Sequence, residues 1–112
     1  MNISYEGIGY LALNMPEMDS VEGHVCAISQ WGDVVCCESG QQFFGVVETV
    51  KNYMACVQVE GFVKLPYTGT EPTAGFIKLV ADGNGGVMMS DNGRTHLVVQ
   101  VDSDNQKLVM KL

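Results

Sequence analysis

Thiol and imidazole groups are the side chains of this sequence most able to do chemistry. The chain has four cysteines and two histidines, and His24 lies two residues before Cys26, so both could face the same side of one strand. A cysteine nucleophile needs a basic partner, which only His24 or His96 could supply. One hypothesis is therefore a small enzyme that uses Cys26 with His24, or the adjacent Cys36 and Cys37.

Metal, phosphate and serine-hydrolase sites need patterns that the sequence lacks. No further cysteine or histidine pair stands at zinc-ligand spacing to complete a site with His24 and Cys26. The oxygen-rich segments 82–84 and 102–105 do not continue into a calcium loop, and the glycines at 83–86 lack the lysine and helix of a phosphate-binding loop. The motif G-x-S-x-G is absent. The sequence therefore predicts no catalytic residue, no metal and no cofactor.

Aromatic side chains in predicted turns offer a different chemistry, the stacking of a ring on a ligand. Trp31 stands beside Gly32 in one such turn, Tyr53 follows a predicted chain reversal, and Tyr67 precedes a long polar loop. Rings at such positions can stack on a sugar or anchor a protein partner. The alternative function is therefore a small-molecule or glycan-binding β-barrel module.

Composition bounds the class of protein. The 112 residues are 46% hydrophobic and 17% charged, which predicts one folded domain over residues 1–112 and no membrane partner. The net charge of −7 would repel a phosphate backbone, so we expect no nucleic-acid partner. Residues 1–15 lack a basic start, and Glu6, Gly7 and Gly9 interrupt their apolar character, so we expect no secretory signal. A cytoplasmic chain with four free thiols follows.

Alternation with a period of two residues runs through the chain and predicts β-strands. Leu108, Met110 and Leu112 alternate with Lys107 and Lys111, and residues 95–102 precede them with a similar pattern and a short polar loop. Turn residues recur about every eight to twelve positions, which is typical of a barrel or a sandwich. The predicted fold is all-β, a small antiparallel β-barrel or sandwich of about eight to ten short strands.

Three further features bear on how these strands are joined. Gly61 interrupts the strand-like run 53–67 and predicts a bulge or bend that curls the sheet into a barrel. Residues 15–17 predict a break between two early strands because they contain a proline. No internal repeat is visible. Charge is uneven, since residues 1–56 hold seven acids and one lysine whereas residues 57–112 hold six acids and five bases.

Spaced glycines, a Gly-Phe-Val strand and a terminal hairpin characterise residues 43–112. The segments concerned are ACVQVEGFVKLPYTG at 55–69, PTAG at 72–75, KLVADG at 78–83, GV at 86–87, GR at 93–94 and LVVQVD at 97–102. Together they resemble the phage head decoration-like proteins, which are compact β-barrels often encoded near the major capsid protein. The resemblance rests on strand and turn motifs and on no catalytic residue.

This resemblance implies a non-enzymatic structural virion protein that decorates or stabilises the capsid of a phage or prophage. The implied partner is the major capsid protein, and the implied assembly is a homo-oligomer, with a trimer favoured. The protein would occupy the host bacterial cytoplasm during assembly and then the virion head. Because loops on rigid barrels carry recognition, the candidate partner-binding residues belong to the longest loop, its flank and the predicted tryptophan turn. They are Tyr67, Thr68, Thr70, Glu71, Pro72 and Trp31.

Overall fold

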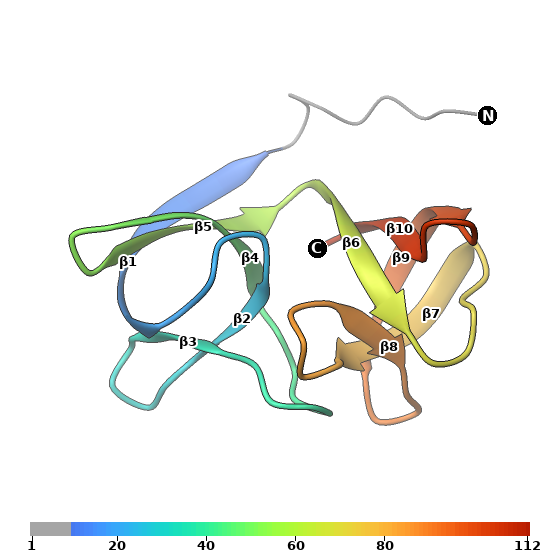
Figure 1. Ribbon diagram of the computed structural model, residues 1–112, viewed down its shortest axis with the longest axis horizontal. Helices are drawn as coiled ribbons and strands as arrows, with labels where there is room; N and C mark the ends of the chain where they lie inside the picture. Colours follow the sequence, from blue (N-terminus) through green and yellow to red (C-terminus); the bar gives the residue numbers. More distant parts are fainter. Residues whose placement is uncertain (1–9) are drawn as a thin grey trace.

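The computed structural model describes residues 10–112 and confirms the all-β prediction (Figure 1). The first nine residues lie outside the described range, and with them most of the segment on which the signal-peptide prediction rests. The described chain forms ten strands. Their bounds are β1 (Leu11–Asp19), β2 (Val25–Ile28), β3 (Val34–Cys36), β4 (Gly45–Lys51), β5 (Met54–Glu60), β6 (Phe62–Thr68), β7 (Gly75–Ala81), β8 (Val87–Met89), β9 (Arg94–Asp102) and β10 (Lys107–Lys111).

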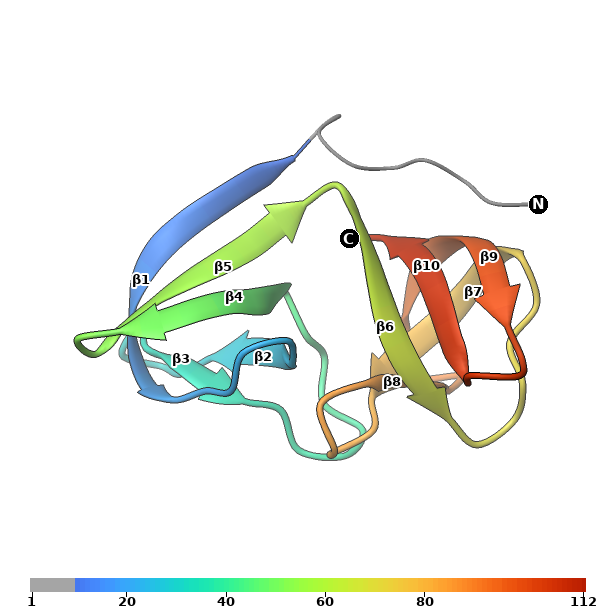
Figure 2. The same ribbon diagram turned by 45° about the horizontal axis from the view of Figure 1, so that its top comes forward.

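The ten strands are divided between two closed five-stranded sheets (Figure 2). Strands β1 to β5 form the first, here called the N-barrel, and strands β6 to β10 form the second, the C-barrel. Gly61, with a φ of 101°, is the single residue between β5 and β6. The bend predicted at Gly61 is therefore the junction at which the chain leaves one barrel and enters the other.

The two barrels share one topology, which makes the chain a structural repeat. Their strand orders are β1-β3-β2-β4-β5 and β6-β8-β7-β9-β10, and in each the first and third strands are parallel. Pro16 and Pro66 are each the last residue of the first strand to pair with the fifth strand, before the parallel pairing begins. A proline fits at this point because it has no N–H to donate to the ladder. The break predicted at residues 15–17 is therefore wrong, since β1 continues through it.

The turn between the second and third strands is built alike in both barrels. It spans residues 29–33 in the N-barrel and 82–86 in the C-barrel. The side chain of its first residue accepts the N–H groups of the third and fifth, at 3.2 and 3.2 Å in one turn and at 2.7 and 3.0 Å in the other. Its fourth residue is Gly32 or Gly85, with φ values of 91° and 95°. The repeat is invisible in the sequence because a serine begins one turn and an aspartate the other.

The two barrels are held together by the β7–β8 turn, which lies against the N-barrel at the centre of the molecule (Figure 1). The N–H of Val25 donates to the carbonyl oxygen of Gly85 at 3.0 Å. Ala81 exchanges two further backbone hydrogen bonds with the β3–β4 connection, accepting from Gly40 at 2.8 Å and donating to Gln41 at 2.9 Å. The barrels are therefore joined by backbone hydrogen bonds as well as by Gly61.

A shared hydrophobic core reinforces this contact. The larger of two buried clusters contains residues of both barrels, among them Val25 and Phe43 from the N-barrel and Leu79 and Leu108 from the C-barrel. The smaller cluster lies inside the N-barrel alone. The ring of Phe43 stacks on that of the buried His96, with centroids 5.1 Å apart. Burying apolar area in common makes each barrel depend on the other for its stability.

The packing of the β7–β8 turn predicts different costs for two matched alanine substitutions. Both Gly32→Ala and Gly85→Ala place a side chain at a positive φ, which costs about 1 to 2 kcal/mol of unfolding free energy. A Cβ at residue 32 meets nothing within 4 Å, whereas a Cβ at residue 85 would lie 2.5 Å from the His24 ring. We expect Gly85→Ala to lose about 1 to 3 kcal/mol more than Gly32→Ala in urea denaturation. Equal losses would contradict the interbarrel contact.

The buried imidazole of His96 predicts a pH dependence of stability. Its Nδ1 lies 3.1 Å from the Lys111 carbonyl oxygen, and burial lowers the pKa of His96 below its ordinary value. The unfolded chain therefore binds more protons than the folded one below about pH 6.5, so stability is lost as the pH falls through that value.

His96→Phe is the matched variant, because phenylalanine keeps a ring against Phe43 and cannot titrate. The unfolding free energy measured from pH 7.5 to pH 5 should fall more steeply in the native chain than in the variant. The variant leaves every carboxylate in place, so parallel curves would mean that His96 does not contribute.

Candidate functional site

The contact loop, predicted over residues 68–75, comprises residues 69–74 in the structure and connects β6 to β7 at the outer end of the C-barrel (Figure 1). Thr70 and Glu71 are exposed, as is Thr68 at the end of β6. Tyr67 is only 4% exposed and Pro72 is buried, so these two candidates pack into the protein and do not reach its surface. Three of the five candidates in this region therefore reach solvent.

Hydrogen bonds hold both ends of this region in place. Thr68 Oγ1 donates to Asp82 Oδ2 at 3.2 Å, and the Tyr67 hydroxyl donates to Glu71 Oε1 at 3.5 Å. Desolvation and the nearby Glu71 carboxylate raise the pKa of Tyr67, so its phenol stays protonated and continues to donate. The loop therefore rises from a fixed base, which suits a contact surface.

Trp31, the sixth candidate, lies at the other end of the molecule. The β2–β3 turn that carries it is at the far side of the N-barrel from residues 69–74 in both ribbon views (Figures 1 and 2). Trp31 is 75% exposed. The six predicted residues therefore do not form one site. Tyr53 and Phe76 are similarly exposed, at 83% and 77%, and Phe76 is not among the residues predicted from the sequence.

Two cysteines are buried where their thiols are unreactive. Cys26 has no exposed surface, and its Sγ donates to the Gly45 carbonyl oxygen at 3.5 Å. Cys37 is buried with its Sγ 4.0 Å from the carbonyl oxygen of Gln42. Burial raises the pKa of Cys26 to about 12 and that of Cys37 to about 11. Because the thiolate is the nucleophile, neither group is activated.

The remaining two cysteines each lie beside a carboxylate. Cys36 Sγ donates to Asp19 Oδ1 at 3.9 Å, and Cys56 Sγ donates to Glu48 Oε1 at 3.7 Å. Partial burial, with the adjacent negative charge, raises the pKa of both thiols. All four cysteines are free, as predicted. Their surroundings are the opposite of the electropositive ones in which catalytic cysteines are found.

The side chains of His24 and Cys26 lie in different surroundings. The His24 side chain packs against Gly85 of the C-barrel, whereas Cys26 is buried in the core of the N-barrel. His24 instead lines a pocket of about 310 Å³ between the barrels, together with Cys36 and Cys37. Sequence reasoning missed this grouping because an interbarrel contact creates it. Across residues 10–112, no three acidic, cysteine or histidine side chains converge in a way that could hold a metal ion.

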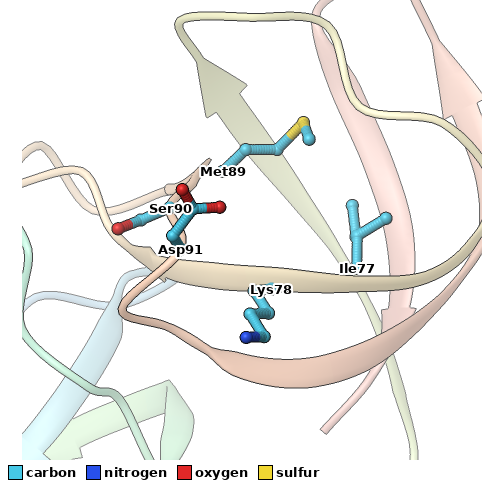
Figure 3. A pocket seen from close by; sticks show the side chains of 5 residues that line it. All are labelled: Ile77, Lys78, Met89, Ser90 and Asp91. Atoms are coloured by element: carbon cyan, nitrogen blue, oxygen red, sulfur yellow. The ribbon is translucent and has the colours of Figure 1, made fainter.

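Two other pockets open on the molecule. One, of about 340 Å³, lies on the C-barrel and is lined by Ile77, Lys78, Met89, Ser90 and Asp91 (Figure 3). The side chains of Ile77 and Met89 point to the same side of the strand there, and Lys78 points to the other. The second pocket, of about 390 Å³, is lined by residues of both barrels. In the first pocket, Ile77 and Met89 offer an apolar surface, whereas Lys78, Ser90 and Asp91 are polar.

Comparison with known proteins gives no relative from which a function could be taken. No family model matches the chain, and no curated protein matches it significantly. Within residues 10–112, no helix is long and apolar enough to cross a membrane. The function is therefore argued from the residues and their arrangement.

Thiol reactivity gives the test of the cysteine chemistry. Raising the pKa of Cys26 from 9.0 to about 12 lowers its thiolate fraction at pH 7 about a thousandfold. We expect iodoacetamide at pH 7 to label Cys26 and Cys37 far more slowly than a free peptide cysteine, and to label all four in denaturant. Peptide mapping by mass spectrometry reads out each residue. Native labelling of Cys26 or Cys37 at the peptide rate would revive the enzyme hypothesis.

Proposed function

We propose that this chain is a non-enzymatic structural protein of a phage or prophage particle, which decorates or stabilises the capsid by binding the major capsid protein. Residues 43–112 supply the first support, through their resemblance to head decoration-like proteins. The chain would act in the host bacterial cytoplasm during assembly and then on the virion head, in several copies.

The observation that carries the proposal is the contrast between thiols that are not activated and large apolar rings that are exposed. The four thiols have raised pKa values, and no cationic side chain is among the causes of these four shifts. Large rings are instead exposed, as Trp31, Tyr53 and Phe76 show. Exposed aromatic side chains on rigid barrels are the usual anchors of protein contacts.

The surface best suited to the capsid is the outer end of the C-barrel. Phe76 follows the contact loop at the start of β7, and the exposed residues Thr68, Thr70 and Glu71 precede it in the sequence. One apolar ring among exposed polar groups is the arrangement of a contact hot spot with a polar rim. Contacts that are weak individually can still bind a capsid tightly when many copies bind at once.

A glycan-binding or small-molecule-binding module remains the second candidate, favoured by the exposure of Trp31 and Tyr53 on the N-barrel. Exposed rings of this kind stack on sugars. Tyr67 no longer supports it, because the ring is buried.

Co-sedimentation with expanded empty capsids of the phage that encodes the chain tests the proposal. We expect the native chain to pellet with the capsids and Phe76→Ala to bind at least about tenfold more weakly, since the ring is the predicted anchor. Tyr53→Ala is the matched control, because it removes an equally exposed ring from the other barrel.

Two outcomes count against capsid binding. If the native chain fails to pellet at every stage of expansion, the proposal is wrong. If the chain instead binds a glycan and Trp31→Ala abolishes that binding, the second candidate replaces the first.

A further inference from the structure

The repeat gives the residues of β2 and β3 counterparts in β7 and β8. Cys26 pairs with Cys36 two positions outside the pair that flanks the β2–β3 turn, and Leu79 pairs with Met89 at the same place beside the β7–β8 turn. Counting outward from these pairs, His24, Val25, Cys36 and Cys37 correspond in order to Ile77, Lys78, Met89 and Ser90.

These corresponding residues line corresponding pockets. The first four line the 310 Å³ pocket between the barrels, whose other wall is Gly83, Asn84 and Gly85 of the β7–β8 turn. The second four line the 340 Å³ pocket on the C-barrel (Figure 3), where Lys78 and Met89 are exposed to solvent. The chain therefore covers this surface in the N-barrel and leaves it uncovered in the C-barrel.

The turn that would cover the second pocket is also free. The counterpart of the β7–β8 turn is the β2–β3 turn, residues 29–33. Gly85 packs on His24, whereas a Cβ on Gly32 would meet nothing within 4 Å, and Trp31 beside it is 75% exposed. The turn and the pocket that meet between the barrels therefore each have a counterpart in the chain. The β7–β8 turn is in contact with the N-barrel pocket, whereas the β2–β3 turn and the C-barrel pocket have no such contact within residues 10–112.

We propose that a second copy of this chain supplies the missing contact. The β2–β3 turn of one copy docks in the C-barrel pocket of the next, with the Trp31 ring against Ile77 and Met89. The contact repeats between copies the packing that already joins the two barrels within each copy. It is heterologous, so successive copies form a ring if the rotation closes and a filament if it does not.

Backbone and side-chain chemistry fit this occupant. Val25 N–H donates to Gly85 O within the chain, and the counterpart groups are Lys78 N–H and Gly32 O. The Lys78 carbonyl oxygen accepts a hydrogen bond from Ser90 N–H at 3.1 Å. Because the N–H and the carbonyl of a strand residue point to the same side, the Lys78 N–H also points toward Ser90, which lines the pocket. A tryptophan ring also packs well on a methionine sulfur.

Charge favours the pairing of unlike barrels. Residues 10–60 carry seven acids and one base, whereas residues 61–112 carry five of each. Two acidic N-barrels would repel one another, whereas a C-barrel carries no net charge and so does not repel an N-barrel. The contact between copies is weaker than the one within the chain. Within the chain, the long β3–β4 connection forms two backbone hydrogen bonds with Ala81, whereas the corresponding β8–β9 connection has only four residues and is too short to form them. Association is therefore concentration-dependent.

The chain contains one tryptophan, so its fluorescence reports directly on this contact. As concentration rises from micromolar to millimolar, we expect the mass from light scattering to exceed the 12.1 kDa monomer and the Trp31 emission to shift to shorter wavelength. Trp31→Ala and Met89→Arg should each raise the dissociation constant at least about tenfold. Tyr53→Ala should associate like the native chain. Ile77→Asp repeats the pocket test should Met89→Arg fail to fold.

Mixing the two defective variants is the decisive arm. Trp31→Ala keeps the pocket and Met89→Arg keeps the turn, so together they should form dimers of one copy each and nothing larger. A native chain that stays monomeric at millimolar concentration, a Trp31→Ala variant that associates normally, or a mixture that stays monomeric would each overturn the proposal. None of these results bears on capsid binding, which Phe76→Ala tests separately.

Discussion

The insertion of the β7–β8 turn between two segments of the N-barrel is the contact on which the rest of the structure depends. The Asp82 carboxylate orders the turn by accepting two backbone N–H groups and the Thr68 hydroxyl. These bonds satisfy polar groups that would cost free energy if they were buried without a partner. Glycine at position 85 then lets the backbone reach the His24 ring. The same aspartate therefore fixes the interbarrel contact and the base of the 69–74 loop.

The repeat explains how one architecture presents two different surfaces. In the N-barrel, Ser29 takes the place of Asp82 and Trp31 takes the place of Asn84 in an otherwise alike turn. The C-barrel turn thereby packs against the N-barrel, while the N-barrel turn presents an aromatic ring to solvent. Differences in the connections act in the same direction, because the longer β3–β4 connection of the N-barrel receives a turn and the shorter β8–β9 connection leaves a pocket open.

Reactive groups are placed so that their chemistry is suppressed. Desolvation raises the pKa of every cysteine, a neighbouring carboxylate adds to this at Cys36 and Cys56, and burial lowers the pKa of His96. Exposed apolar rings are found instead at turns and strand starts, outside the buried core. This distribution is what a protein that works through its outer surface requires, and it supports binding rather than catalysis as the proposed role.

The sequence by itself determined the strands, because alternation along 95–102 and 107–111 and the turn residues between them are local properties. It also indicated the free thiols. Only the tertiary structure decided that Gly61 separates two barrels, that Tyr67 is buried, and that His24 faces Gly85. The physical reason is range: a period of two fixes which side of a strand faces inward, but which barrel a strand closes is set by contacts between residues far apart in the chain.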